Sequence, residues 1–484
     1  MKHEFSVIRE NSKILIGDGE NTFFWTDKWG GPPLCDILQI PPNIHQFLQS
    51  RVSDYIQNFQ WNIPWQLQTL FPNLKNLVEQ VTIPVVHKCD KLIWTNSASG
   101  DLSLKEAYLF KSQHIQKIHW AKTIWSKDIP PSKALITSRI MHDKMPTDEK
   151  LRERGCNLPS IYNLCLQQEE TTFHLFFDCS FSIRLWTWFS QILNLNLHFN
   201  DVEEIWNLCD RSWTPQCKLV IKAAIVNILT TIWFVRNQAR FNNKTIQWRS
   251  AISLVSSSVS FTGNNTTLTS YSSKTNFQIL KKFDISIHPP KAPVIKEVIW
   301  NPPLINWTKA NTDGSATSTN SACGIIFRDS NAVCLLCMSE NLGPGNAFSA
   351  ELCGAMRAIE VAYQKQWFNL WLETDSQLVV LAFKNSSCVP WTLRNRWENC
   401  NNLLISMNFM VTHIYREGNQ CADSLANIGL STQGLFLGEF VPSLLASRYS
   451  KDKLGMPSFR FVSFRGFWLS PPSLYLFFLF SMKV

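Results

Sequence analysis

Apolar side chains recur at helical spacing in two distant parts of the chain. Within AFSAELCGAMRAIEVAYQ, the apolar positions at i, i+4, i+7 and i+11 predict a helix over residues 347–366, and they are Leu352, Met356, Ile359 and Tyr363. Within IVNILTTIWFVRNQARF, a second set shares one helical face, and it comprises Ile225, Ile228, Ile232 and Val235. The sequence therefore predicts amphipathic helices both in the middle of the chain and in its C-terminal half.

Strand and helix patterns alternate between residues 307 and 430. Three strand-like runs precede the helix at 347–366, and they cover 309–313, 324–327 and 333–338. After it come the strand LWLET, a helix beginning in DSQLVV, the amphipathic stretch NRWENCNNLLISM, the strand MVTHIY and the short helix ADSLANI. The predicted order is βββαβαβα with one extra helix, which is typical of a compact α/β domain.

The remaining segments have different patterns. Residues 1–30 predict short strands around the turn Gly17-Asp18-Gly19, and FFWTDKW predicts a packed strand or hairpin. Residues 94–249 are predicted to be mainly helical. Ser, Thr and Asn dominate after residue 250 and three prolines follow by residue 293, which predicts a linker over 250–300. Residues 431–484 lack clear periodicity and are interpreted as a tail.

Composition supports a multidomain globular protein. The chain has 484 residues, of which 45% are apolar and 17% charged, so about three domains are expected. No apolar signal-peptide core begins the chain, and the run LYLFFLFSM is too short to span a bilayer, so we expect an intracellular protein that is neither secreted nor membrane-spanning. Fourteen cysteines then indicate thiols or metal ligands in a reducing compartment. The net charge of +9 fits weak phosphate attraction and an ordinary solvated surface equally well.

Four acidic residues lie where separate elements would bring them to one end of the predicted sheet: Asp313, Glu351, Asp375 and Asp423. Converging carboxylates repel one another, so hard divalent cations that take oxygen ligands normally hold such a cluster. Two magnesium ions at such a site can activate a water and stabilise the leaving oxygen of an in-line phosphoryl displacement. Taken singly, an aspartate before a turn or at a helix start is also explained as a cap.

The same segment resembles the ribonuclease H type domain at the C-terminus of plant LINE-type (non-LTR) retrotransposon reverse transcriptases. The resemblance covers roughly residues 307–430 and rests on WTKANTDGSA, GIIFRDS, AELCGAMRAIEVA, LWLETDSQLVV and HIYREGNQCADSLAN. It implies a five-stranded mixed sheet flanked by helices, with the four carboxylates binding Mg²⁺ or Mn²⁺. It also implies endonucleolytic cleavage of the RNA strand of an RNA–DNA hybrid, which is then the expected nucleic-acid partner.

The loop before the last carboxylate departs from that family. Many members carry a product-releasing His there, whereas this loop is REGN, in which Arg416 is the candidate substitute. His413 is predicted to be an ordinary strand side chain. Ser376, Arg416 and Asn419 are candidate substrate-binding residues. For Ser376 and Asn419 the alternatives are that they orient the carboxylate cluster or act as cap or turn residues.

The run CLQQEETTFHLFFDC places Cys165, His174 and Cys179 within reach of one zinc ion, which prefers thiolate and imidazole ligands. Residues 91–186 resemble the zinc-binding domain that follows the polymerase in the same family, through DKLIWTNSASGDLSLKEAY, IWSKDIPPSKA, KMPTDEKLRERG and EETTFHLFFDCSFSIRLW. The family has a first Cys where this chain has Tyr162, and Cys156 is an alternative ligand with different spacing. A helical domain with packed Cys and His residues is the other interpretation. Cys334 and Cys337 also have CxxC spacing, but they lie in an apolar run and are interpreted as core.

The predicted organisation follows from both resemblances. It consists of a post-polymerase strand and turn remnant at 1–50, the zinc-binding-like domain at 91–186, a helical extension at 187–249, the linker at 250–300, the ribonuclease H-like domain at 305–430 and the tail at 431–484. Two functions remain: a divalent-metal ribonuclease of RNA–DNA hybrids, or a catalytically inactive nucleic-acid-binding remnant of a retrotransposon polyprotein. Convergence of the carboxylates in a structure distinguishes them. The sequence identifies no protein partner.

Overall fold

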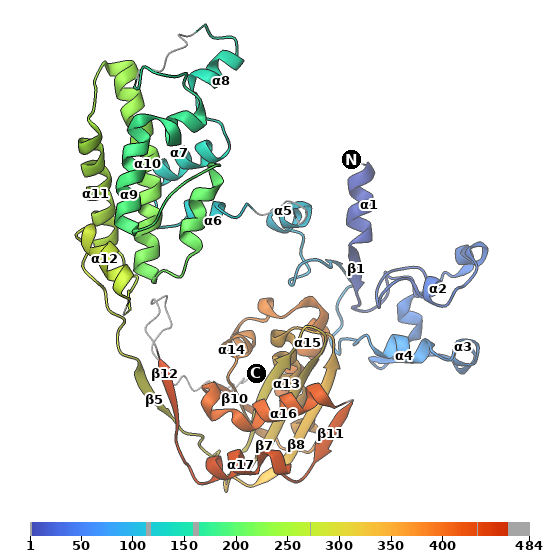
Figure 1. Cartoon of the computed structure of the whole chain (residues 1–484). Coiled ribbons are helices and arrows are strands. Elements are labelled where there is room, and N and C mark those ends of the chain that lie inside the picture. The colour runs from blue at the N-terminus through green and yellow to red at the C-terminus, as the bar shows by residue number, and fades with distance from the viewer. Residues whose placement is uncertain (1, 113–117, 158–163, 272, 433, 463–484) are drawn as a thin grey trace. The chain divides into compact units, whose positions relative to one another are not determined.

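The structure, a computed structural model, describes residues 2–112, 118–157, 164–271, 273–432 and 434–462 (Figure 1). These residues form two compact units. The first unit contains residues 2–112 and 294–462, and the second contains residues 118–293. The second unit is therefore inserted between two parts of the first.

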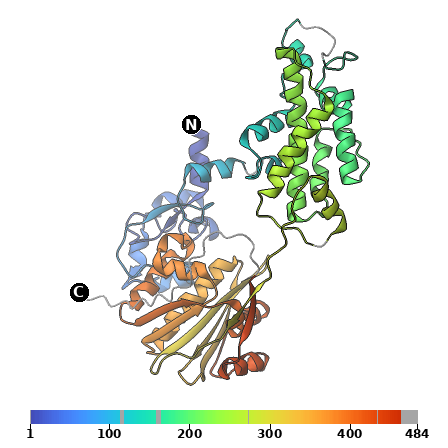
Figure 2. The same ribbon diagram turned by 90° about the vertical axis from the view of Figure 1, so that its left-hand side faces the viewer.

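A six-stranded mixed sheet organises the C-terminal part of the first unit, in the order β10-β9-β6-β7-β8-β11 (Figure 2). The strands are β6 (Thr308–Ala316), β7 (Ser321–Arg328), β8 (Cys334–Gly343), β9 (Asn369–Thr374), β10 (Asn408–His413) and β11 (Leu435–Gly438). β6, β7, β8 and β11 pair antiparallel, whereas β9 is parallel to both β6 and β10. The α/β fold is confirmed, but the prediction of five strands is wrong, because β11 adds a sixth from the segment interpreted as a tail.

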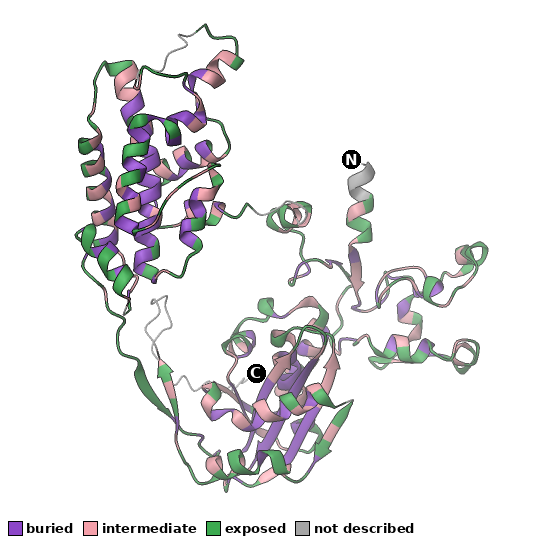
Figure 3. Ribbon diagram, in the orientation of Figure 1, coloured by how far each residue is buried: buried purple, intermediate pink, exposed green. Residues whose placement is uncertain are grey.

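Helices cover both faces of this sheet. α13 (Ala347–Gln364) packs on one face and α16 (Gln420–Ser431) on the other. Gly314 and Gly324 permit this close packing, because an added Cβ would collide with the backbone of Glu351 in α13 and of Ala426 in α16, respectively. The predicted apolar stripe of α13 is buried at Leu352, Met356 and Ile359, and Tyr363 lies at its more exposed end. The buried strands stand out in Figure 3.

Shorter helices complete this part of the first unit. They are α14 (Gln377–Lys384), η5 (Ser386–Cys388), η6 (Trp391–Leu393), α15 (Arg394–Leu404), η7 (Arg416–Gly418), η8 (Ser443–Leu445) and α17 (Ala446–Lys453). β5 (Val294–Val298) and β12 (Ser458–Val462) form a separate antiparallel pair. Within the described residues, the segment predicted to be a tail is thus folded onto the domain as β11, α17 and β12. Its pairing partners lie at least 95 residues away, so local periodicity could not show them.

The N-terminal part of the first unit is attached to α15. Its elements are α1 (Lys2–Glu10), β1 (Ser12–Leu15), α2 (Leu34–Ile37), η1 (Pro42–Phe47), η2 (Val52–Tyr55), β2 (Ile56–Gln57), β3 (Gln60–Trp61), α3 (Trp65–Leu70), α4 (Leu74–Glu79), β4 (Lys91–Trp94) and α5 (Leu104–Ser112). The buried Asn395 of α15 donates to the carbonyls of Ile16 and Thr82, both at 2.9 Å. Lys88 and Glu398 form an ion pair at 2.5 Å.

Two predictions for the N-terminal part are corrected. FFWTDKW forms turns rather than a strand, although its aromatic side chains Phe24, Trp25 and Trp29 are buried in a local core. Large aromatics can fill a core from irregular backbone, so their clustering does not require a strand. The predicted domain start at residue 91 is not a structural boundary, because β4 pairs antiparallel with β1.

The second unit is helical. It contains α6 (Ala121–Ile124), α7 (Pro131–Met141), α8 (Asp148–Glu153), η3 (His174–Asp178), α9 (Ser180–Leu193), η4 (Glu203–Asp210), α10 (Pro215–Asn242), α11 (Trp248–Asn264) and α12 (Lys274–Lys282). The predicted face of α10 is fully buried, as is visible in Figure 3. Among the described residues, α10 alone is long and apolar enough to span a membrane, yet 72% of its most apolar stretch is buried within the unit. That burial fits a core helix.

The predicted linker at 250–300 is wrong, because α11 and α12 fold into the core of the second unit. Ala251, Val255 and Val259 are buried at i, i+4 and i+8 spacing, so α11 has an apolar stripe. Serines occupy many of its other positions, so the composition of the segment did not reveal this stripe. Ser273 caps α12 by accepting a hydrogen bond from the backbone N–H of Asn276.

Candidate active site

Three of the four predicted carboxylates meet at one edge of the sheet. Asp313 lies near the end of β6, Asp375 follows β9, and Glu351 lies in the second turn of α13. Because β6 and β9 are parallel neighbours, they deliver Asp313 and Asp375 to the same edge. Oxygens of Asp313, Glu351 and Asp375 all lie within 4.8 Å of one another. The predicted convergence is therefore present for these three residues.

Burial and neighbouring charges disfavour the ionised forms of Asp313 and Glu351. Burial, followed by the charges of Asp375 and Asp423, raises the pKa of Asp313 to about 8. Burial and the charges of Asp313 and Asp375 raise the pKa of Glu351 to about 9. Within the described part of the chain, Glu351 Oε2 is buried and accepts no hydrogen bond. A divalent cation would relieve the repulsion and supply the missing partner, so these residues fit an oxygen-ligated metal.

Asp423 is held outside this group. It lies in the first turn of α16, and Arg416 Nη2 contacts its Oδ1 at 2.5 Å. Arg448 lies 3.8 Å from its other oxygen, to which Asn427 also donates at 3.3 Å. The assignment of Asp423 as a fourth metal ligand stays a prediction.

The three candidate substrate-binding residues have different environments. Ser376 precedes α14 and its backbone N–H donates to Thr374 Oγ1 at 3.2 Å. Arg416 is 71% exposed and adjoins the carboxylates through Asp423. Asn419 is only 1% exposed and its amide bonds within the protein. This burial favours a role for Asn419 in orienting the carboxylates, and a substrate contact by Asn419 stays a prediction.

His413 ends β10 beside the site, as a strand side chain. Its Nε2 lies 3.1 Å from the carbonyl oxygen of Asp375. Burial lowers its pKa, so the neutral imidazole is favoured.

Sequence reasoning missed a cluster of buried polar residues next to the carboxylates. Lys309 and Asn311 share the face of β6 that carries Asp313, and Arg328, Glu373 and Trp300 surround them. Lys309 pairs with Glu373 at 2.8 Å. The alternation of Lys309, Asn311 and Asp313 was the available signal, because side chains two apart on a strand share a face.

Cys165, His174 and Cys179 also converge, in the second unit. One ligand atom from each lies within 4.8 Å of the other two, and Cys165 Sγ is 3.4 Å from His174 Nε2. His174 begins the π-helical turn η3 and Cys179 follows it. The Cys179 N–H donates to the His174 carbonyl at 2.7 Å. Burial lowers the pKa of His174, which favours the neutral, metal-binding imidazole. This donor set fits zinc.

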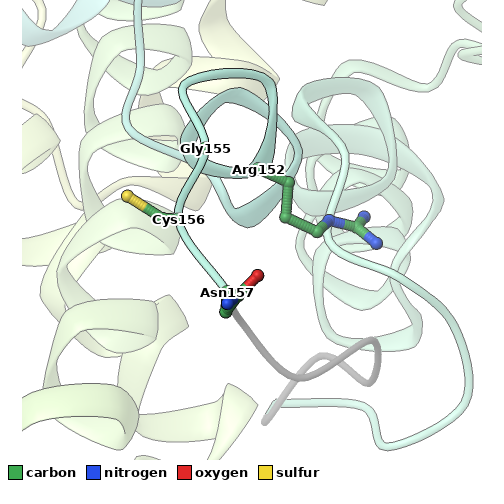
Figure 4. Close-up of a pocket in the computed structure, with 4 residues that line it drawn as sticks. All are labelled: Arg152, Gly155, Cys156 and Asn157. Carbon is green, nitrogen blue, oxygen red and sulfur yellow. The ribbon is translucent and has the colours of Figure 1, made fainter.

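The two alternatives for a fourth zinc ligand have different outcomes. Tyr162, at the expected Cys position, lies outside the described residues. Cys156 is exposed and lies outside the convergent group. It lines a surface hollow with Arg152, Gly155 and Asn157 (Figure 4).

The glutamates of the EETTFHLFFDC run have structural contacts. Glu170 is buried and receives two hydrogen bonds from the buried Arg236 of α10, at 2.6 and 3.0 Å. Its Oε1 also accepts from the backbone N–H of Asp148 at the start of α8. Glu169 pairs with Arg152 at 2.8 Å. These contacts fasten the segment before His174 to α8 and α10.

Cys334 and Cys337 face each other on β8, with 3.4 Å between their sulfurs. Cys337 is fully buried with Ile326 and Leu425 in a small apolar cluster. Their interpretation as core residues agrees with this packing.

Two family descriptions match the chain. The family described as zinc-binding in reverse transcriptase matches residues 102–186. The family described as reverse transcriptase-like matches residues 311–429. Both lie where the sequence resemblance placed them.

The similarity to one known protein extends beyond those segments. A protein of Arabidopsis thaliana named as a candidate ribonuclease H is 23% identical over 93% of this chain and 72% of its own length. The solved ribonuclease H1 of the archaeon Halobacterium salinarum NRC-1 is 25% identical, covering 26% of this chain and 97% of its own, with a TM-score of 0.24. LC11 ribonuclease H1, solved in complex with an RNA/DNA hybrid, is 24% identical, covering 26% of this chain and 96% of its own, with a TM-score of 0.23.

Proposed function

We propose that this chain is a reverse transcriptase-like protein of the plant retrotransposon type, in which a zinc-binding segment precedes a ribonuclease H-like domain, and that it cleaves the RNA strand of RNA–DNA hybrids with divalent metal ions. The observation that carries the proposal is the convergence of Asp313, Glu351 and Asp375 at one sheet edge. The unpartnered Glu351 Oε2 supports a metal ligand role there.

Each residue has a distinct task in this proposal. When bound, two Mg²⁺ or Mn²⁺ ions would activate a water and stabilise the leaving oxygen of the phosphodiester. Asp313, Glu351 and Asp375 provide carboxylate oxygens at one point, and the fold holds them there before the metal arrives. Asp423 joins them once Arg416 releases its carboxylate. The exposed Arg416 guanidinium then contacts a phosphate of the hybrid, a pairing that its planar donors favour.

We also infer that Cys165, His174 and Cys179 hold a zinc ion with a structural role. The soft thiolate and imidazole donors suit zinc rather than magnesium. Two of the three ligands are buried, and Glu170 fastens the same segment to α10, so an ion there would stabilise the helical unit.

Cleavage of a labelled RNA–DNA hybrid by the full chain tests the nuclease. We expect Mg²⁺- or Mn²⁺-dependent cutting of the RNA strand alone, lost in Asp313→Asn and kept in Glu439→Gln, which removes a carboxylate with an exposed side chain. Double-stranded DNA of the same sequence should stay intact. A folded chain that binds Mn²⁺ but cuts no hybrid would overturn the proposal and leave a non-catalytic nucleic-acid-binding protein.

A further inference from the structure

The face of the sheet beneath the start of α16 buries an unusual set of polar side chains. Lys309, Asn311, Arg328 and Asn419 are each at most 1% exposed, and Glu373 is 6% exposed. Burying such groups is unfavourable unless each finds a partner, so their mutual contacts specify one arrangement. The proposed nuclease mechanism assigns no role to these residues.

Asn419 connects this cluster to the carboxylates. Its Nδ2 donates to Asp375 Oδ1 at 3.2 Å and to the Thr312 carbonyl at 2.9 Å. Its Oδ1 accepts from Asn311 Nδ2 at 3.2 Å. The bond from Asn311 therefore favours the amide orientation in which Asn419 points its N–H group at Asp375.

The partners of Asn311 determine its own orientation. Asn311 Oδ1 accepts from Trp300 Nε1 at 2.8 Å and from Arg328 Nη2 at 2.7 Å, and its Nδ2 also donates to Glu373 Oε2 at 3.0 Å. Indole and guanidinium groups only donate, and an ionised carboxylate only accepts. A flipped Asn311 would lose all three bonds, so the polarity of its amide is fixed.

Arg328 is in turn anchored from outside the reverse transcriptase-like match at 311–429. Its Nη1 pairs with Asp452 Oδ2 of α17 at 2.7 Å, and its guanidinium lies 3.6 Å from the ring centre of Trp300. Trp300 follows β5, and Asp452 precedes β12, the partner of β5. Arg328 thus donates both to Asp452 and to Asn311, and from Asn311 the donor direction continues through Asn419 to Asp375.

We propose that Asn311 and Asn419 are positioning residues that aim the Asp375 carboxylate at Asp313 and Glu351, and that Asp452 sets their orientation. The proposal rests on the proposed function, because it assigns these residues to the metal affinity of the same site. Outer residues that orient ligands typically change metal affinity or activity about 10–100-fold when altered.

Titration of the full chain with Mn²⁺ by calorimetry tests this without relying on cleavage. The binding heat that is measured for the wild type but not for Asp313→Asn is assigned to Mn²⁺ binding at the carboxylates. Asn311→Asp keeps the size and the contacts with Trp300 and Arg328, but it opposes acceptor to acceptor at Asn419 and Glu373. We expect its Mn²⁺ dissociation constant to rise about tenfold.

A second variant keeps the test decisive if Asn311→Asp does not fold. Asp452→Asn lies at the partly exposed end of the chain of bonds, and we expect its dissociation constant to rise about threefold, a smaller change because the bonds between it and Asp375 can adjust. Glu439→Gln, which removes a charge from the same C-terminal segment without a buried partner, should bind Mn²⁺ as the wild type does.

Excess metal separates positioning from structural damage. In cleavage assays, saturating Mn²⁺ should restore most of the rate of Asn311→Asp and Asp452→Asn, with the KM for hybrid unchanged, whereas Asp313→Asn stays inactive. Wild-type affinity in folded Asn311→Asp or, should that variant not fold, in Asp452→Asn overturns the inference. Absence of carboxylate-dependent Mn²⁺ binding in the wild type overturns the proposed function instead.

Discussion

The two ligand clusters, one in each unit, differ in how charge affects them when no metal is bound. Asp313, Glu351 and Asp375 repel one another without a cation, and the pKa values of the first two are raised to about 8 and about 9. The Cys165, His174 and Cys179 cluster can remain neutral without metal, because burial favours the uncharged imidazole and the uncharged Cys179 thiol. The carboxylates therefore depend on the sheet to hold them together, whereas the cysteines and histidine need only a short folded segment.

Two ion pairs, one from each unit, differ in exposure. The Glu170–Arg236 pair of the second unit is almost fully buried. In the first unit, the Glu360–Arg396 pair on α13 and α15 leaves 22% of each side chain exposed. Breaking a buried pair leaves an uncompensated charge, so removing one partner should cost more in the Glu170–Arg236 pair than in the Glu360–Arg396 pair.

The largest expected effect concerns these pairs. Glu170→Ala should lower the free energy of unfolding of the second unit by about 3 kcal/mol, because Arg236 stays buried and keeps only its longer ion pair, with Asp148 at 3.4 Å. Glu360→Ala should cost the first unit about 1–2 kcal/mol, since water reaches its partners. Urea unfolding followed by hydrogen exchange in peptides from α10 and β6 measures both. Equal losses of unfolding free energy in the two variants would contradict the expected difference between the two ion pairs.

Metal-ligand substitutions should separate the two clusters by activity. Asp313→Asn should lower the hybrid cleavage rate at least about 100-fold, equivalent to about 2.7 kcal/mol, because it removes a central ligand. Cys165→Ser should leave the rate within about twofold, a change of less than about 0.5 kcal/mol. Initial rates with saturating Mg²⁺ make the comparison. A matching loss in folded Cys165→Ser would mean that the two clusters act together.

Zinc removal should affect stability in the second unit alone. At ten times its dissociation constant, a bound ion stabilises the folded state by about 1.4 kcal/mol. Elemental analysis should find one zinc per wild-type chain and none in Cys179→Ser, and a zinc-selective chelator should increase hydrogen exchange in η3 but not in β6. Unchanged exchange in η3 after zinc loss would exclude the structural role.

A pH dependence is also expected of the metal-free carboxylate cluster. A carboxyl whose pKa is raised on folding stabilises the protein at low pH, and this contribution is lost as pH rises from the ordinary carboxyl range through about 8. The free energy of unfolding in chelator should therefore fall between about pH 6 and about pH 8, by at most about 1.4 kcal/mol per pH unit for one group. The thermal midpoint, measured at each pH, should fall with it. Asp313→Asn should flatten this slope, and Mg²⁺ should reverse its sign. An unchanged slope in Asp313→Asn would exclude this carboxyl as the source.

Spacing along the sequence predicted the elements that carry both clusters. The stripe of α13, the face of α10 and the strand before Asp375 are where their periodicity put them. These features depend on neighbours within a few turns, which a pattern of apolar positions records directly. The zinc ligands belong to the same class, because a single short run contains all three.

Long-range pairing explains most of the failures. Val294–Val298 reads as linker and Ser458–Val462 as tail, and only their mutual pairing makes them strands. The contact of Asp452 with Arg328 joins residues from opposite ends of the domain. The sequence leaves open whether Asn419 orients the carboxylates or contacts substrate, and only the fold shows that its side chain is buried. Such outcomes depend on which surfaces meet, which no local window contains.

The insertion of the helical unit has a consequence for synthesis of the chain on the ribosome. β5 emerges before the sheet strands, but its partner β12 emerges only after them, and Asp452 arrives with that last segment. The helical unit, by contrast, is complete once residue 293 has left the exit tunnel. Domains generally fold as units in the order of their synthesis. The helical unit should thus fold before the sheet, while the carboxylates acquire their final geometry only after residue 462 has emerged.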